Sequence, residues 1–213
     1  LSDNWEVYMA YQVKRINKKE EIGSCDQFAI EQYYWDSKQE PKAHGWMGYL
    51  ENQGFFVKMV CEEKNPRREH TEHRKRVCDD SGMEIFFAFT EENEDLSNDS
   101  MYINFEMNAN GALYAKYGKG RKNRTFITEE VCEMCQTKGC VEEDTWSVEI
   151  LIPESFLEEI CDFERIKAGK MFYFNFYKIS ETKEIEHFGS CYPINSPTPN
   201  FHLPVCFGKA VIA

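Results

Sequence analysis

The sequence predicts an all-β fold, an antiparallel β-sandwich of the jelly-roll type with one or two short helices. Eight segments are rich in aromatic and β-branched residues and are separated by Gly, Asn, Pro and charged clusters, the pattern of short strands joined by turns. Only one segment has a convincing helix start. Many strands with little helix favour a sandwich or barrel over an α/β fold. At 213 residues, the chain is expected to be one domain over residues 1–213 with a sizeable core.

The predicted strands run along the whole chain. They are Tyr8–Ile16, Gly54–Glu62, Gly82–Thr90, Ser100–Asn108, Gly111–Tyr117, Thr145–Ile152, Lys170–Ile179 and Cys206–Ile212. A helix is predicted over Glu154–Ile160, because Pro153 is tolerated in a first helical turn, where no backbone N–H is needed. The segments Glu63–Asp80, Glu91–Asp99 and Pro193–Pro204 are rich in charge or proline and are predicted to be irregular connections.

The charge balance argues against two classes of partner. The chain carries 25 Lys and Arg against 37 Asp and Glu, a formal net charge of −12. A nucleic-acid binder or a protein that binds anionic membrane surfaces needs a basic face, so neither class is expected. No apolar run approaches the roughly 20 residues that span a bilayer. Nine cysteines, an odd number, favour reduced thiols over a disulfide framework.

One predicted strand alternates between an apolar face and a face of unusual polar composition. Side chains of a strand point alternately to its two sides, so the apolar residues of Ser100–Asn108 should face the core. Its other face consists of Tyr102, Asn104, Glu106 and Asn108. Amides, a carboxylate and phenols offer hydrogen-bond donors and acceptors beside flat apolar rings, the combination that a sugar requires. The alternative is that this face packs internally under loops, with its polar groups satisfied there.

Several short stretches, taken in order, resemble the family 9 carbohydrate-binding modules, in particular the stand-alone family 9-like proteins of bacteria. They are Asp80–Phe87, Tyr102–Gly111, Arg121 with Arg124, Trp146–Pro153, Asn175–Lys178, His187–Ser190, and Phe201–Pro204 with Phe207 and Gly208. The resemblance implies a jelly-roll-like β-sandwich that binds polysaccharide ends or small sugars without catalysis. It also implies that structural calcium is an option, and the acidic segment Glu91–Asp99 is the candidate for it.

The resemblance implies a site in which two tryptophans hold a sugar and polar side chains bind its hydroxyl groups. This chain has Cys191 and Tyr192 where the family often has a tryptophan after the serine, here Ser190, so one wall of that site is altered. The candidate stacking residues are Trp46, Tyr102 and Tyr192. The candidate polar residues are Arg76, Asn104, Glu106, Asn108, Lys178 and His202.

Two other functions stay open at this stage. A small glycoside hydrolase or accessory protein would use Glu84 and Glu106 as its carboxylate pair. A thiol or metal module would use Cys132, Cys135 and Cys140, whose spacing is that of a partial zinc or iron–sulfur site.

The expected partner is a carbohydrate ligand, with no nucleic acid and no membrane, and the protein is expected to be a monomer. The cysteines favour the cytoplasm, whereas a role in polysaccharide degradation would imply secretion.

Overall fold

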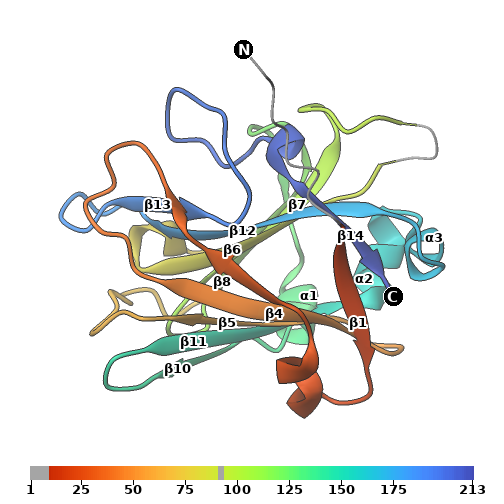
Figure 1. Cartoon of the computed structure of the whole chain (residues 1–213), viewed down its shortest axis with the longest axis horizontal. Helices are drawn as coiled ribbons and strands as arrows, with labels where there is room; N and C mark the ends of the chain where they lie inside the picture. The colour runs from red at the N-terminus through yellow and green to blue at the C-terminus, as the bar shows by residue number, and fades with distance from the viewer. Residues whose placement is uncertain (1–9, 91–93) are drawn as a thin grey trace.

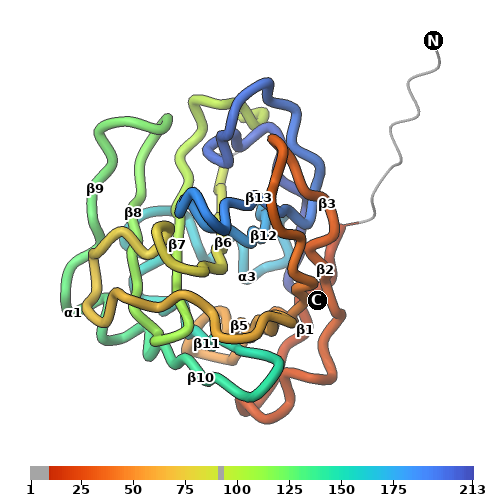
Figure 2. The backbone as a smooth tube through the Cα atoms, turned by 90° about the vertical axis from the view of Figure 1, so that its left-hand side faces the viewer, coloured from red at the N-terminus to blue at the C-terminus, as the bar shows by residue number. Residues whose placement is uncertain are grey.

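Two β-sheets lie face to face in the computed structural model, which describes residues 10–90 and 94–213 (Figure 1). Figure 2 shows them edge-on, with β5, β10 and β11 below β6, β7 and β12, so we call them the lower and the upper sheet. This arrangement confirms the predicted β-sandwich. None of the helices in the described ranges has both the length and the apolar character needed to cross a membrane.

In the lower sheet, four strands lie side by side, and two further strands pair with the last of them, β4. It consists of β10 (Lys138–Val141), β11 (Trp146–Pro153), β5 (Gly54–Cys61) and β4 (Ala43–Leu50), with β2 (Gln27–Ile30) and the second half of β1 (Tyr11–Ile16) on β4.

The upper sheet starts from the first half of β1. It continues through β14 (Gly208–Ile212), β12 (Phe172–Ser180), β6 (Gly82–Ala88), β7 (Met101–Asn108), β8 (Leu113–Lys119) and β9 (Thr125–Phe126), with β13 (His187–Ser190) on β12 and β3 (Gln32–Tyr33) on β13.

The sheets are mixed, which corrects the prediction of a purely antiparallel sandwich. Strand β1 runs parallel to both of its neighbours, with residues 11–13 paired to residues 210–212 and residues 14–16 paired to residues 48–50. Because β1 changes partner halfway along its length, it belongs to both sheets and joins them at one edge. The part of the predicted first strand at Tyr8 and Met9 lies outside the described residues.

In the described part of the chain, three short α-helices accompany the strands, α1 (Glu129–Met134), α2 (Glu154–Ile160) and α3 (Phe163–Lys167). Short 3-10 helices cover residues 19–24, 77–79 and 204–206. Only α2 was predicted. The other two begin at Thr128 and Asp162, whose side chains accept a hydrogen bond from the backbone N–H three residues on, so each has a local capping signal.

The sequence analysis did not predict strand β4, because the strand contains two glycines, Gly45 and Gly48, and glycine normally weakens a strand. Gly45 sits where a Cβ atom would lie 2.4 Å from the carbonyl oxygen of Lys58 and 2.6 Å from the ring of Phe28. Glycine therefore permits a close approach between β4 and its neighbours rather than ending the strand.

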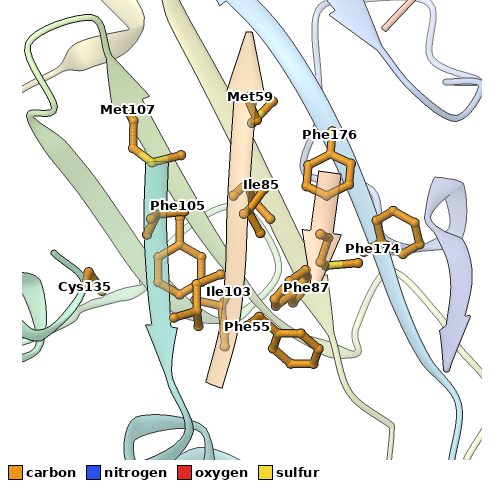
Figure 3. Packing of buried hydrophobic residues seen from close by; sticks show 14 of the residues in the cluster. Phe55, Met59, Ile85, Phe87, Ile103, Phe105, Met107, Cys135, Phe174 and Phe176 are labelled. Atoms are coloured by element: carbon orange, nitrogen blue, oxygen red, sulfur yellow. The ribbon is translucent and has the colours of Figure 1, made fainter. Parts of the chain in front are cut away.

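The predicted alternation of β7 is confirmed on both of its faces. Ile103, Phe105 and Met107 point into the core between the two sheets, where Figure 3 shows them beside Ile85 and Phe87 of β6. The opposite face of the upper sheet carries a second apolar cluster under the segment 193–207. Its buried members are Phe86, Ala88, Tyr102, Tyr177, Ile179, Phe188, Ile194, Phe201 and Phe207. The upper sheet is thus covered on both sides, and only part of its outer face stays open.

Candidate functional site

The open part of that outer face is a pocket of about 230 Å³ across β6, β7 and β8. The strand side chains that point away from the core form its floor, and residues 199–202 form one wall. The lining residues are Arg76, Cys78, Glu84, Asn104, Glu106, Tyr114, Lys116, Arg121, Arg124, Ile179, Glu181, Phe188, Pro199, Asn200, Phe201 and His202.

Two carboxyl groups lie side by side on the floor of the pocket. Glu84 of β6 and Glu106 of β7 are directly opposite each other in the strand register, and they are 3% and 6% exposed. Asn104 Nδ2 donates a hydrogen bond of 2.8 Å to Glu106 Oε1. Burial raises the pKa of Glu106 to about 7, against the effect of the Asn104 hydrogen bond. Burial, together with the neighbouring charge of Glu106, holds the pKa of Glu84 well above its ordinary value.

Arg124 fixes the loop that follows β8 against the edge of the floor. Its Nη2 donates to Asn104 Oδ1 at 2.8 Å and to the Tyr102 and Lys116 carbonyl oxygens at 2.9 and 3.0 Å. Its Nη1 donates to the Gly118 and Gly120 carbonyl oxygens, and its guanidinium carbon lies 3.6 Å from the centre of the Tyr102 ring. Arg124 thereby orients the Asn104 amide, whose NH₂ group turns toward Glu106.

His202 closes the pocket from the segment above the sheet. Its Nδ1 lies 2.8 Å from the Tyr102 hydroxyl oxygen, and that hydroxyl donates a hydrogen bond of 3.0 Å to the Gly120 carbonyl oxygen. Burial and the positive charge of Arg124 lower the pKa of His202 to about 3, so the ring is neutral at physiological pH. A neutral imidazole keeps one donor and one acceptor for hydrogen bonding.

The rim of the pocket is built around Arg76. Its Nη2 lies 2.7 Å from Glu181 and 3.2 Å from Asp79, and this pairing raises the pKa of Arg76. The Cys78 thiol lies 3.7 Å from Glu181, and burial raises its pKa above the ordinary value, so this thiol stays protonated.

Four of the residues predicted from the sequence come together in this pocket, namely Arg76, Asn104, Glu106 and His202. They come from segments as far apart as residues 76 and 202. Tyr102 lies directly behind them, buried, with its hydroxyl on His202.

Asn108 lies on the same face of β7 but holds a loop instead of lining the pocket. Its Nδ2 donates to Asp80 Oδ2 and to the His70 carbonyl oxygen, both at 2.7 Å. Asp80 in turn accepts hydrogen bonds from the backbone N–H groups of Glu69 and His70. The two side chains therefore anchor the irregular segment 63–80 to the end of β7.

Lys178, a candidate polar contact of the sugar, is fully buried between the sheets. Its Nζ lies 2.6 Å from Ser81 Oγ, 2.7 Å from His187 Nε2 and 3.4 Å from Glu63 Oε2. The ammonium is therefore part of the interior and faces away from the pocket, because even- and odd-numbered residues of β12 point to opposite sides.

The two remaining stacking candidates also lie elsewhere. Trp46 is half-buried on the outer face of the lower sheet, edge-on to His44 and packed on the cluster of Ile16, Leu50 and Phe56. Tyr192 packs edge-on against Phe174 at 5.3 Å, and its ring covers Gly208. A clamp formed by these two rings is therefore not present at the pocket.

Sequence reasoning missed several lining residues. Tyr114 and Lys116 of β8 alternate with Leu113 and Ala115, which point into the core, so the same period-two pattern that identified β7 was available there. Arg121 was cited only as part of a family motif. Glu84 was considered only as a catalytic acid, although its place opposite Glu106 also follows from pairing of the two predicted strands.

Two groups of closely spaced acidic or thiol side chains occur among the described residues, Cys78 with Asp79 and Glu181, and Glu154 with Glu158 and Glu164. Each group already contacts a basic side chain, Arg76 in the first and Lys167 in the second. Calcium takes six to eight oxygen ligands, so a calcium ion in either group would compete with these ion pairs. Of the predicted acidic segment, residues 91–93 lie outside the described residues.

The three cysteines of the metal-module alternative are not brought together as ligands among the described residues. Cys132 and Cys135 are buried, whereas Cys140 is exposed on β10, and none of the three belongs to the ligand groups above. Burial raises the pKa of Cys132 and Cys135, which disfavours the thiolate that a metal requires.

The comparison with protein families identifies one family, and solved structures share the fold. The family model for carbohydrate-binding family 9 matches residues 14–212. A protein of Bacteroides uniformis for which carbohydrate binding is inferred has a similar fold, with a TM-score of 0.77 and 22% identity over 96% of this chain and 99% of that one.

Two structures of a family 9 module from Caldicellulosiruptor kristjanssonii, one with cellotriose and one with glucose, each have a TM-score of 0.61 and 12% identity over 96% of this chain. The match covers 93% of the module in the cellotriose complex and 96% in the glucose complex. No curated protein sequence matches the chain.

Proposed function

The chain belongs to carbohydrate-binding family 9, and we propose that it binds a small sugar or the end of a polysaccharide in the pocket of the upper sheet, without cleaving it. The observation that carries this proposal is the convergence of Asn104, Glu106 and His202 on one pocket. Their amide, carboxyl and imidazole groups supply donors and acceptors in a partly desolvated place, where a hydroxyl group that fails to pair is costly. The family 9 module from Caldicellulosiruptor kristjanssonii, which has a similar fold, was solved with glucose and with cellotriose.

The size of the pocket favours a chain end over the middle of a chain. Its volume of about 230 Å³ lies below the roughly 300–1,000 Å³ of pockets for drug-sized ligands. Residues 199–202 close one side, so a polysaccharide could enter with only its terminal rings. Tyr114 is the half-buried aromatic residue of the floor, and we assign it the stacking role that Trp46 and Tyr192 cannot fill from their positions.

The placement of the two carboxyl groups supports binding over hydrolysis. Glycoside hydrolases position their two carboxyl groups on either side of the bond that is cut. Glu84 and Glu106 are neighbours on one face of one sheet, so they approach a sugar from the same side. Their raised pKa values also work against a permanently ionised nucleophile.

The test is calorimetric titration with glucose and cellotriose, followed by an array of plant, microbial and mammalian glycans. We expect binding in the micromolar to millimolar range, as few-contact ligands allow. Asn104→Ala should weaken the binding by at least about tenfold, because it removes an amide of the pocket floor and the hydrogen bond that this amide donates to Glu106. Asn17→Ala is the matched control, since Asn17 is exposed beyond the end of β1.

Trp46→Ala should leave the affinity unchanged, because Trp46 lies on the outer face of the opposite sheet. An array with no hit from folded protein would contradict the proposed binding. Release of reducing ends from a bound glycan, lost in Glu106→Gln, would contradict the proposed absence of catalysis.

A further inference from the structure

The carboxyl group of Glu84 lies on the pocket floor without a hydrogen-bonding partner among the described residues. It is 3% exposed and lines the pocket, yet within the described part of the chain it forms neither a hydrogen bond nor an ion pair. A buried carboxyl group of this kind either accepts a hydrogen bond from a ligand or, if protonated, donates one.

No cation pairs with either carboxyl group among the described residues. Arg124 is bonded to carbonyl oxygens and to Asn104, and Arg76 is paired with Asp79 and Glu181. Two ionised carboxylates directly opposite each other on neighbouring strands repel, so the pair is expected to retain a proton. The Asn104 amide donates to Glu106 and favours its ionised form, which places the proton on Glu84.

The surroundings of Glu84 agree with this placement. The titratable and charged groups around it come from several elements. They are Glu106 on β7, Tyr114 and Lys116 on β8, Arg121 and Arg124 in the loop after β8, Tyr177 on β12 and Glu181 after it, Arg76 before and Cys78 within the 3-10 turn of residues 77–79, and His202 above the sheet. Burial and the charges of Glu106 and Glu181 raise the pKa of Glu84, while Arg121 opposes them.

We propose that Glu84 and Glu106 bind the ligand as one unit with a single proton, Glu84 donating a hydrogen bond as a carboxylic acid and Glu106 accepting one as a carboxylate. This inference rests on the proposed function and names the chemistry that the site selects. The ligand class that fits is an uncharged sugar ring with two adjacent hydroxyl groups, one accepting from Glu84 and the other donating to Glu106.

The first experiment needs no ligand. Carboxyl-carbon NMR titration of protein labelled with ¹³C at the glutamate carboxyl should show that Glu106 ionises before Glu84 as the pH rises, with the two resonances assigned from Glu84→Gln and Glu106→Gln. In Glu106→Gln, Glu84 should ionise at a lower pH than in the wild type, because the charged neighbour that opposes its ionisation is gone, whereas in Glu84→Gln the ionisation of Glu106 should change little, because Glu84 is still neutral when Glu106 ionises. Ionisation of Glu84 below pH 5 would overturn the proposal, whether or not any sugar binds.

The second experiment measures the affinity of the tightest-binding sugar of the panel from pH 5 to pH 9.5. We expect the wild-type affinity to fall about fivefold from pH 8 to pH 5.5, because Glu106 then loses the charge that strengthens its hydrogen bond. It should also fall at the alkaline end, where Glu84 loses its proton.

Glutamine resembles a protonated carboxyl group in that it can donate a hydrogen bond. Glu84→Gln should therefore bind within about twofold of the wild type at pH 7 and keep its affinity at pH 9.5, whereas Glu106→Gln should bind at least about fivefold more weakly. Glu149→Gln is the control, because Glu149 lies on the lower sheet in an ion pair with Lys58. It should change neither the acidic nor the alkaline loss of affinity. Loss of binding in Glu84→Gln at every pH would overturn the proposal and leave the proposed sugar binding intact.

Discussion

The ammonium nitrogen of Lys178 lies 3.4 Å from a carboxylate oxygen of Glu63 in the interior of the sandwich. The Trp146 indole donates to the same carboxylate at 2.8 Å, and the Ser81 hydroxyl contacts both charged groups. His187 accepts from Lys178 at Nε2, while its Nδ1–H donates to the Ile185 carbonyl. Burial and the charge of Lys178 lower the pKa of His187 to about 3, so this ring stays neutral and the pair holds one positive and one negative charge.

Removal of one partner of this pair should be strongly destabilising. Lys178→Met leaves the Glu63 carboxylate buried without its cation, and we expect the free energy of unfolding to fall by about 3–5 kcal/mol. Urea denaturation at pH 7 measures the change. The double variant with Glu63→Gln should recover part of the loss, because no unpaired charge then remains. A single variant as stable as the wild type would show that the pair is not desolvated.

The pH dependence of stability should change in Glu106→Gln. The pKa of Glu106 rises from about 4.5 in the unfolded chain to about 7 in the folded one, so the folded state binds the proton more tightly. Wild-type stability from this group is complete below pH 4.5 and falls as the pH rises to about 7. The variant, which has no such proton, should gain about 1–3 kcal/mol relative to the wild type between pH 4.5 and pH 8. Urea midpoints at the two pH values test this, and equal shifts at both would contradict it.

Replacement of Arg124 by lysine should destabilise the fold. The guanidinium donates to four carbonyl oxygens and to Asn104 from two nitrogens in one plane, which an ammonium on a flexible stem cannot reproduce. We expect Arg124→Lys to lower the free energy of unfolding by about 2 kcal/mol. Arg68→Lys, at an exposed residue with a single 3.4 Å contact to Asn110, is the control and should be neutral. Thermal unfolding of both variants measures the change. Equal melting temperatures of Arg124→Lys and Arg68→Lys would contradict the role of Arg124.

Asn108→Ala separates a structural role from a binding role. The side chain donates to Asp80 and His70 and accepts from the backbone N–H groups of Asn110 and Ala112. Its loss should cost about 2–3 kcal/mol of stability, since the Asp80 carboxylate is fully buried. Sugar affinity of the folded variant should stay within about twofold of the wild type. A large loss of affinity with little loss of stability would instead restore Asn108 as a ligand contact, as the sequence suggested.

Much of the site could be predicted because it depends on strand periodicity. The alternation along β7 places Asn104 and Glu106 on one face whatever the rest of the fold, and pairing with β6 then sets Glu84 opposite Glu106. Periodicity does not tell which polar residues at the ends of a strand meet a loop. Asn108 is such a case, because its partner Asp80 comes from the irregular segment before β6.

The rest depended on contacts between distant segments. Lys178 shares a face of β12 with three phenylalanines that point into the core. A charged side chain is tolerated on that face because Glu63 and His187, from other segments, contact its ammonium group. Trp46 was a candidate stacking residue, but the side of the sandwich on which β4 lies is set by the pairing of β4 with β1, β2 and β5. Parallel pairing of β1 likewise has no local signal, because it joins residues about 200 positions apart.

That last pairing has a consequence for how the chain folds. Residues 11–13 gain their neighbours in the upper sheet only when residues 210–212 are available, so the connection between the sheets waits for the end of β14 to leave the ribosome. Contacts between residues far apart in the sequence slow folding, because the chain loses conformational entropy when the long loop closes, before the new contacts stabilise it. A nascent chain that stops before residue 208 would therefore hold β6, β7 and β8 without β14 at the edge of β12, and the face proposed to bind sugar would form on a sheet still open to other strands.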